Sequence, residues 1–251
     1  MHKYFDINEE GFSVRCKLYC DDPRGIRRVI VFGHGFGGHM DNKAAERFAV
    51  KALAKYRHLG IVTFNWPCHG SDARNKLVLA DCDTYLRLVN TYCREQLGAE
   101  TLYAYATSFG AYIFLKYMHE HGTPFKRTVL RCPAIPLYEV FTHSIIGKEE
   151  LEKLAKGKPV LAGFDRKVRI TQDLLEEIRE ADVTQWDFLD LSEDILIQHG
   201  TKDEIVPAEG IRRFADDNLI ELEEIEGADH RFQDPKKMDY AISEILKFLD
   251  L

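Results

Sequence analysis

Short apolar runs that fit buried β-strands alternate with longer amphipathic segments along most of this chain of 251 residues. The longer segments carry the 3.6-residue hydrophobic period of helices. The predicted strands of this series are 28–32, 61–65, 102–106, 127–131, 195–198 and 219–225. The predicted helices are 43–59, 82–97, 109–121, 208–217 and 235–248. This alternation predicts an α/β fold with a mostly parallel sheet and helices on both faces.

The N-terminal region departs from that order. Segments 3–8 and 12–20 alternate apolar and polar side chains, as Phe12, Val14, Cys16 and Leu18 show. Alternation with a period of two is typical of strands that are buried on one face. We therefore expect an antiparallel start to the sheet.

The stretch 133–190 also departs from it, because no steady order of strands and helices is visible there. The stretch is too long for a simple loop. We predict a core domain made of 1–132 and 191–251, with 133–190 inserted as a cap, or lid, over the active site.

The composition, with 45% hydrophobic and 30% charged residues, is ordinary for a soluble globular protein. The net charge of -7 argues against a nucleic-acid partner, because phosphate binding relies on clustered Lys and Arg. The apolar runs are strand-sized, so no membrane span is expected. Residues 1–20 lack the apolar core of a signal peptide, and the six cysteines are irregularly spaced. A cytoplasmic protein with reduced thiols is the expectation.

The sequence Ala106-Thr107-Ser108-Phe109-Gly110 lies between a predicted strand and a predicted helix. A tight strand-to-helix turn needs small neighbours around its central residue and exposes that residue at the edge of the sheet. We expect Ser108 to be a nucleophile presented there. Taken by itself, the motif could also be a structural helix N-cap.

His34-Gly35-Phe36-Gly37-Gly38 follows the strand 28–32. Acyl transfer needs N–H donors aimed at the developing oxyanion, and a Gly-rich turn can supply them. The backbone amides of Phe36 and Phe109 are the expected oxyanion donors. The alternative is an ordinary Gly-rich turn, and His34 is expected to support the loop rather than to catalyse.

Two further loops follow predicted strands near the C-terminus. Asp203 lies after strand 195–198 and can fix the tautomer of a catalytic imidazole, with Glu204 as its neighbouring rival. His230 lies after strand 219–225, in the small-residue loop Gly227-Ala228-Asp229-His230. The oxyanion loop, Ser108, Asp203 and His230 occur in the chain order of a Ser–Asp–His triad, each after a strand. A Cys68–His69 pair is a weaker nucleophile candidate, because Cys68 is not at a strand-to-helix turn.

These motifs resemble those of the α/β-hydrolase superfamily over nearly the whole chain. The chain is most similar to small bacterial feruloyl (cinnamoyl) esterases and their monoacylglycerol-lipase-like relatives. The segment 65–72, Asn-Trp-Pro-Cys-His-Gly-Ser-Asp, matches that family's loop after the fourth strand, and Gly163-Phe164 resembles part of its cap. Ala106 and Thr107 stand where many members carry Gly-His.

The resemblance implies a serine esterase that acts on a small-molecule ester through an acyl-serine intermediate. Ser108 would attack, His230 would take its proton, and no metal or organic cofactor would be required. Thioesters, monoacylglycerols, small peptides or amides remain alternative substrates, since fold does not choose the substrate. A non-catalytic ligand-binding scaffold is the alternative from another class.

Aromatic side chains of the predicted cap offer surface for the substrate. Phe164 and Trp186 are the predicted substrate-binding residues. Apolar side chains in such a segment are, however, more often core than substrate wall. The aromatic residues of this region are Tyr138, Phe141, Phe164, Trp186 and Phe188.

Overall fold

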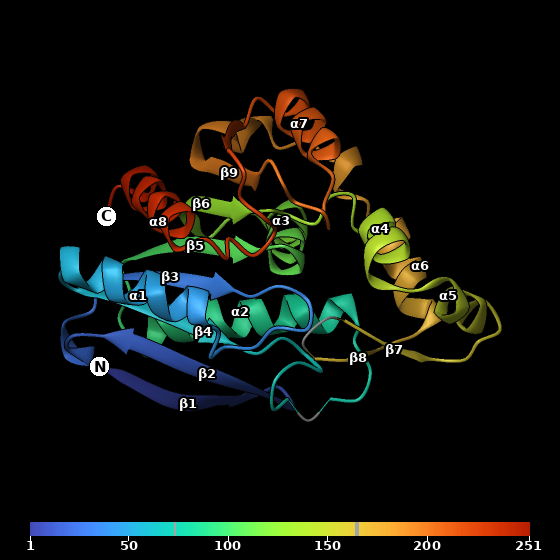
Figure 1. The fold of residues 1–251 in the computed structure, drawn as a ribbon. Helices are drawn as coiled ribbons and strands as arrows, with labels where there is room; N and C mark the ends of the chain where they lie inside the picture. Colours follow the sequence, from blue (N-terminus) through green and yellow to red (C-terminus); the bar gives the residue numbers. More distant parts are fainter. Residues whose placement is uncertain (73, 164–165) are drawn as a thin grey trace.

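An eight-stranded sheet forms the centre of the computed structural model, which describes residues 1–72, 74–163 and 166–251 (Figure 1). The order of its strands is β1-β2-β4-β3-β5-β6-β9-β10. The bounds are β1 His2–Glu9, β2 Phe12–Cys20, β3 Arg28–Gly33, β4 Leu59–Phe64, β5 Thr101–Thr107, β6 Phe125–Arg131, β9 Ile195–Gly200 and β10 Glu221–Ile225. β1, β2 and β4 pair antiparallel, and every later neighbour pairs parallel. The predicted α/β class and the antiparallel start are both confirmed.

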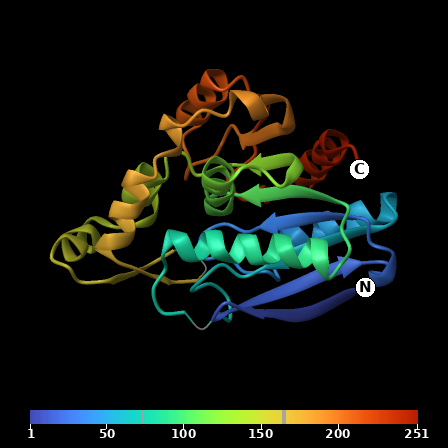
Figure 2. The ribbon, with the colours of Figure 1, turned by 180° about the vertical axis from the view of Figure 1, so that it is seen from behind.

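Helices cover both faces of this sheet (Figures 1 and 2). α1 and α8 lie on one face, where Phe48 and Ile242 join Ile30 and Tyr105 in a buried cluster. α2 and α3 cover the opposite face. The bounds are α1 Lys43–Lys55, α2 Leu79–Glu95, α3 Phe109–His121, α7 Ala208–Asp217 and α8 Pro235–Leu249. The apolar, near-continuous strands are buried because both faces are covered.

The predicted element bounds differ from the observed ones mainly at turns. α1 ends at Lys55, short of the predicted 59, because His58 takes a positive φ of 59° and β4 begins at the next residue. Likewise, Leu219 takes a φ of 54°, so β10 begins only at Glu221. A 3-10 turn, Pro23–Gly25, precedes β3.

The segment between β6 and β9 contains several short elements that the sequence pattern did not predict. A two-stranded antiparallel hairpin and three helices lie together beside the sheet (Figure 1). The bounds are α4 Leu137–Val140, η2 Phe141–Ile145 (one π turn), α5 Lys148–Ala155, β7 Val160–Ala162, β8 Val168–Ile170, α6 Gln172–Glu180, η3 Val183–Gln185 and η4 Leu189–Asp194. The hydroxyl of Tyr112 donates to the carbonyl of Ala181 at 2.8 Å and ties this segment, which we call the insert, to α3.

Parallel pairing brings the carboxyl ends of β3, β5, β9 and β10 to one edge of the sheet. The loops that leave this edge carry the residues singled out from the sequence. Within the described residues, no helix is both long and apolar enough to cross a membrane.

Candidate active site

Ser108 occupies a sharp turn between β5 and α3. Its backbone angles, φ 51° and ψ −119°, lie in a region that non-glycine residues rarely adopt. The end of β6 stabilises the turn, because the Ser108 amide donates to the Arg131 carbonyl at 3.0 Å. Strained backbone of this kind is a recognised feature of the nucleophile turn. It leaves the Ser108 side chain at the carboxyl edge of the sheet.

Small residues around Ser108 are required by close backbone approach. A Cβ on Gly110 would lie 2.6 Å from the carbonyl oxygen of His34 and 2.8 Å from that of Gly33. A Cβ on Gly35 would lie 3.2 Å from the Ser108 Cβ. Ala106, the departure from the usual glycine, pairs across the sheet with Gly33 and is fully buried. A neighbour without a side chain leaves room for the methyl group.

His230 connects Ser108 to Asp203. Its Nε2 lies 3.0 Å from Ser108 Oγ, and its Nδ1 lies 2.7 Å from Asp203 Oδ2. With the proton on Nδ1, the ring donates to the carboxylate and leaves Nε2 free to accept the hydroxyl proton. The three residues predicted from separate loops therefore form one hydrogen-bonded chain.

The Asp203 carboxylate is fully buried and satisfied on both oxygens. Its Oδ1 accepts from the amides of Ile205 and Val206, both at 2.9 Å. Burial opposes ionisation, but the hydrogen bonds from His230 and these amides outweigh it and lower the pKa of Asp203 below its ordinary 3.8. Glu204, the rival, is exposed. An ionised Asp203 suits the stabilisation of an imidazolium.

The Gly-rich loop after β3 packs directly against Ser108. His34 is buried, and the backbone carbonyl of Gly35 accepts from its Nδ1 at 2.9 Å. Burial, with His69 nearby, holds the pKa of His34 well below its usual range, so this ring stays neutral. The amides of Phe36 and Phe109 have no hydrogen-bond acceptor among the described residues. Two free N–H groups beside a serine hydroxyl can bind an oxyanion.

The loop 65–72 supports the Gly-rich loop from behind. Asn65 Oδ1 accepts from the Met40 amide at 2.9 Å, and the Trp66 indole donates to the His34 carbonyl at 2.8 Å. The buried His69 ring stacks on Phe109, and its Nδ1 faces the Pro67 carbonyl at 2.8 Å. These contacts give the loop a positioning role.

Cys68 lacks the features of a nucleophile. Burial, together with Asp72, raises the pKa of its thiol to about 11. The thiolate is the reactive form, and the nearby His69 directs Nδ1 to a backbone carbonyl instead. The structure therefore does not support the Cys68–His69 alternative.

Two residues near Asp203 received no role of their own from the sequence, although His199 begins the motif that contains Asp203. His199 is fully buried, its Nε2 faces the Val206 carbonyl at 3.1 Å, and it lies 3.8 Å from Asp203 Oδ2. Cys132, the first residue after β6, brings its thiol to within 4.8 Å of ligand atoms of Asp203 and His230. Its position at a strand end was the available signal. Burial and Asp203 raise the pKa of the Cys132 thiol, and Asp203 is already fully hydrogen-bonded, so the trio suits the triad better than a metal ion.

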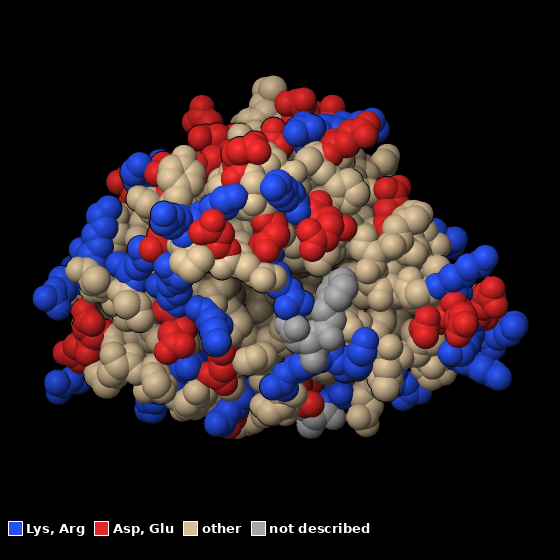
Figure 3. Space-filling view, in the orientation of Figure 1, with Lys and Arg blue, Asp and Glu red and all other residues tan. Residues whose placement is uncertain are grey.

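A cavity of about 840 Å³ opens at Ser108 and His230. It runs along the face that carries α1 and α8, and Figure 3 shows a hollow on this side of the molecule. Ile145 of the insert and Ile205 of the β9–α7 loop lie at its border with the insert. The cavity offers room for a small-molecule substrate next to the hydroxyl of Ser108.

Of the two predicted substrate-binding residues, Trp186 belongs to the described part of the chain, and it does not lie at this cavity. Trp186 stacks on His119 near the end of α3, with ring centroids 4.3 Å apart, and it does not line the cavity. This corrects the assignment of Trp186: the insert returns along α3 and carries the indole away from the carboxyl edge. Phe164 lies outside the described residues. Phe141 of the insert contacts the Gly-rich loop beside the site, with its ring centroid 4.9 Å from that of Phe36.

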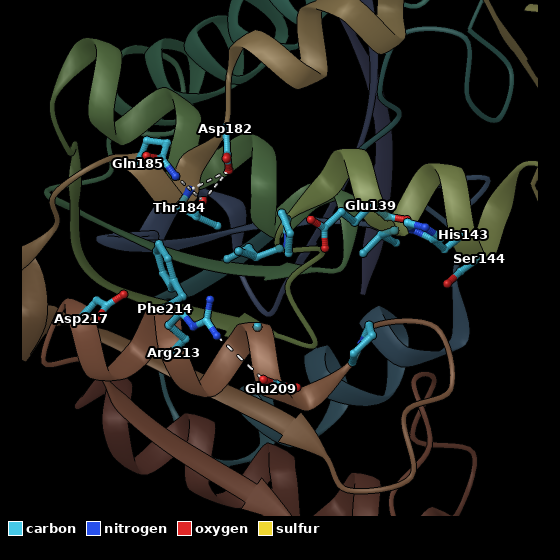
Figure 4. A pocket seen from close by; sticks show the side chains of 15 residues that line it. Glu139, His143, Ser144, Asp182, Thr184, Gln185, Glu209, Arg213, Phe214 and Asp217 are labelled. Atoms are coloured by element: carbon cyan, nitrogen blue, oxygen red, sulfur yellow. Dashed lines mark hydrogen bonds and ion pairs between the residues drawn. The ribbon is translucent and has the colours of Figure 1, made fainter. Parts of the chain in front are cut away.

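A second cavity, of about 610 Å³, lies between the insert and α7 and shares no lining residue with the first (Figure 4). Glu139, His143 and Ser144 line it from the insert, and Glu209 and Arg213 line it from α7. Neither Ser108 nor His230 borders it. We therefore assign the candidate active site to the first cavity.

Solved structures with the same fold cover nearly the whole chain. Est1E from Butyrivibrio proteoclasticus, with ferulic acid bound, is 18% identical over 98% of this chain and 97% of that chain, with a TM-score of 0.76. A soluble variant of monoglyceride lipase from Saccharomyces cerevisiae, with a substrate analog, is 16% identical over 100% of this chain and 94% of that one, with a TM-score of 0.70. Alpha/beta hydrolase domain-containing protein 10 from mouse is 15% identical over 99% and 98%, with a TM-score of 0.71. At these identities the likeness shows the fold alone.

No curated protein matches the sequence significantly. The family model described as the alpha/beta hydrolase fold matches residues 28–159, just over half of the 251 residues. Together with the observed strand order, this match identifies the chain as a member of the alpha/beta hydrolase fold family.

Proposed function

We propose that this protein is a serine hydrolase that cleaves carboxylic esters through an acyl-serine intermediate. The observation that carries the proposal is the hydrogen-bonded chain from Ser108 through His230 to the buried Asp203. A binding scaffold would not need these three groups in register, so the chain of contacts favours an enzyme over a non-catalytic relative.

The chemistry follows from the proton positions. Ser108 Oγ attacks the ester carbonyl carbon while its proton passes to Nε2 of His230. The carbonyl oxygen becomes negative and accepts hydrogen bonds from the amides of Phe36 and Phe109. The imidazolium then protonates the departing alcohol oxygen as the C–O bond breaks. A water molecule, deprotonated by His230, attacks the acyl-serine and releases the acid.

The family resemblance favours aryl-acyl esters of the feruloyl or cinnamoyl type. Est1E, the fold relative with bound ferulic acid, lends the same support. The predicted cap, residues 133–190, lies within the insert and would act as the lid over this site. Its Ile145 borders the catalytic cavity, and Ser144 Oγ donates to the Ile205 carbonyl at 2.9 Å.

A fluorophosphonate probe tests the nucleophile directly. Labelling of the wild type that is lost in Ser108→Ala supports the proposal, whereas labelling that persists excludes Ser108. A panel of feruloyl, short-chain and long-chain acyl esters, with matched thioesters and amides, then separates the esterase from the thioesterase, lipase and amidase alternatives.

A further inference from the structure

A buried arginine lies one strand away from the candidate nucleophile. Arg131 ends β6, is 5% exposed, and pairs in register with Thr107, the residue before Ser108. Its side chain projects to the face of the sheet that α1 and α8 cover, where its guanidinium contacts Met238 of α8.

The guanidinium of Arg131 has no anionic partner among the described residues. One terminal nitrogen lies 3.2 Å from the sulfur of Met238, which is only a weak acceptor. The rings of Tyr105 and Phe232 lie 5.9 Å and 5.1 Å from its central carbon, and its buried Nε has no hydrogen-bond partner. Buried charges are ordinarily paired, because desolvation without a partner destabilises the fold. Ring contacts offset only part of that cost.

This unpaired charge borders the catalytic cavity. Arg131 and two of its contacts, Phe232 and Met238, all line the cavity that opens at Ser108. A group that extends from an ester bound at Ser108 can therefore reach the guanidinium without leaving the cavity.

The remaining charges of the cavity are mostly positive. Lys43, Arg47 and Arg231 line it, although the whole chain has a net charge of -7, and Arg47 is ion-paired with Asp239 at 2.6 Å. Asp41 is the acidic side chain among the lining residues, and Lys17 and Tyr4 already donate to it, both at 2.8 Å. Figure 3 shows Lys and Arg side chains beside the hollow on this face, with Asp and Glu side chains above it. A cavity of this charge attracts anions.

We propose that the cavity binds esters that carry an ionised carboxyl group away from the reacting carbonyl, with Arg131 as the residue that recognises it. The inference rests on the proposed esterase function. The planar guanidinium matches a carboxylate, and one unpaired positive charge is balanced by the single negative charge that a carboxylate brings. The apolar side chains of Phe232 and Met238 line the cavity beside the guanidinium, and burying a singly charged carboxylate against them costs less than burying a doubly charged phosphate.

Paired substrates that differ in one charge test this. For the acyl side, 4-nitrophenyl hydrogen glutarate is compared with methyl 4-nitrophenyl glutarate, in which the free carboxyl group is methylated. For the alcohol side, 4-carboxyphenyl butyrate is compared with 4-carbamoylphenyl butyrate. In at least one pair, the wild type should show a kcat/KM about 10- to 100-fold higher for the charged ester, the range of a charge-assisted hydrogen bond.

Variants locate the source of the preference. Arg131→Met should reduce the charged-to-neutral ratio to near one, and Arg131→Lys should retain part of it. Lys236→Gln is the matched control, because it removes the same charge from an exposed residue outside the cavity and should keep the wild-type ratio. An equal fall of the ratio in Lys236→Gln would show a general field effect and overturn the assignment to Arg131.

Other outcomes also decide the question. A wild type that prefers the neutral ester in both pairs overturns the inference, as does an unchanged ratio in Arg131→Met. If Arg131→Met does not fold, competitive inhibition of the wild type by glutarate, compared with glutaramide and inorganic phosphate, decides instead. Stronger inhibition by glutarate supports the carboxylate site, and stronger inhibition by phosphate or glutaramide refutes it. Fluorophosphonate labelling of the same preparations distinguishes failure of this inference from failure of the proposed function. Protein that is labelled but shows no preference for the charged ester refutes only the carboxylate site.

Discussion

Asp203 holds His230 at 2.7 Å with one carboxylate oxygen, while two amides of its own loop hold the other. The carboxylate can therefore neither rotate nor exchange partners without breaking buried hydrogen bonds. This fixes the imidazole in the tautomer that carries its proton on Nδ1, so that Nε2, which faces Ser108, can accept a proton.

Asp203→Asn is expected to lower kcat on any ester that the wild type cleaves by about 10⁴-fold, because the amide favours the wrong tautomer of His230. Glu204→Gln, at the exposed neighbouring position, should stay within about twofold of the wild type, as surface changes usually do. Steady-state kinetics on purified variants decide between the two residues. The reverse ranking would move the acid role to Glu204.

Gly110→Ala is expected to lower the free energy of unfolding by about 1–3 kcal/mol, the range of an overpacked site. The new methyl group would meet two backbone oxygens closer than 3.0 Å, and neither is a flexible side chain. Gly25→Ala is the control, since its Cβ meets only the His58 ring at 3.2 Å. Urea denaturation measures both, and equal losses would contradict the steric account.

Ile145→Ala should change the ranking of esters in the substrate panel, because Ile145 borders the catalytic cavity. Relative kcat/KM values should shift by about 10- to 200-fold, the range given by one missing methylene in an apolar pocket. Labelling by a small fluorophosphonate should persist. Trp186→Ala, which removes an indole that stacks on His119 near the C-terminal end of α3, should leave the ranking unchanged. If both variants depress labelling and every ester alike, the insert holds the triad in place instead of selecting the acyl group.

The wild type should lose stability on acidification between about pH 6.5 and 4. Burial lowers the pKa of His69 to about 4, from an ordinary 6.5. A base with a lowered folded pKa contributes its stability fully above the unfolded pKa and loses it as pH falls through the folded one. The shift corresponds to about 3 kcal/mol of unfolding free energy. Urea titrations at pH 7 and 4 should show a smaller loss in His69→Gln, and an identical loss would exclude His69 as a source.

The parts of the fold that sequence predicts are those with a regular hydrophobic period. α3 was predicted from Phe109 to His121 and is observed there, because its apolar residues repeat against a buried sheet. The catalytic candidates were recognisable because Ser108, Asp203 and His230 each follow such a strand.

The insert was harder to predict because its elements are short. β7 and β8 have three residues each, too few for a period to be visible. α6 carried a usable signal, since Thr171 caps it and accepts from the Leu174 amide at 3.3 Å. The path of the insert along the core depends on contacts between residues that are distant in sequence, such as the stacking of Trp186 on His119. The local sequence around Trp186 does not predict such contacts.

The backbone of Ser108 has a consequence for selection. Non-glycine residues with positive φ occur at Cys68, Ser108, Cys132 and Phe232, each in a loop at the carboxyl edge. Such conformations cost about 1–3 kcal/mol each, and glycine would adopt them with less strain. Selection for thermal stability alone would favour glycine over serine at position 108. Ser108→Gly should therefore have a higher melting temperature than the wild type and should not hydrolyse esters. Under the proposed function, stability favours glycine at position 108, whereas catalysis requires serine there.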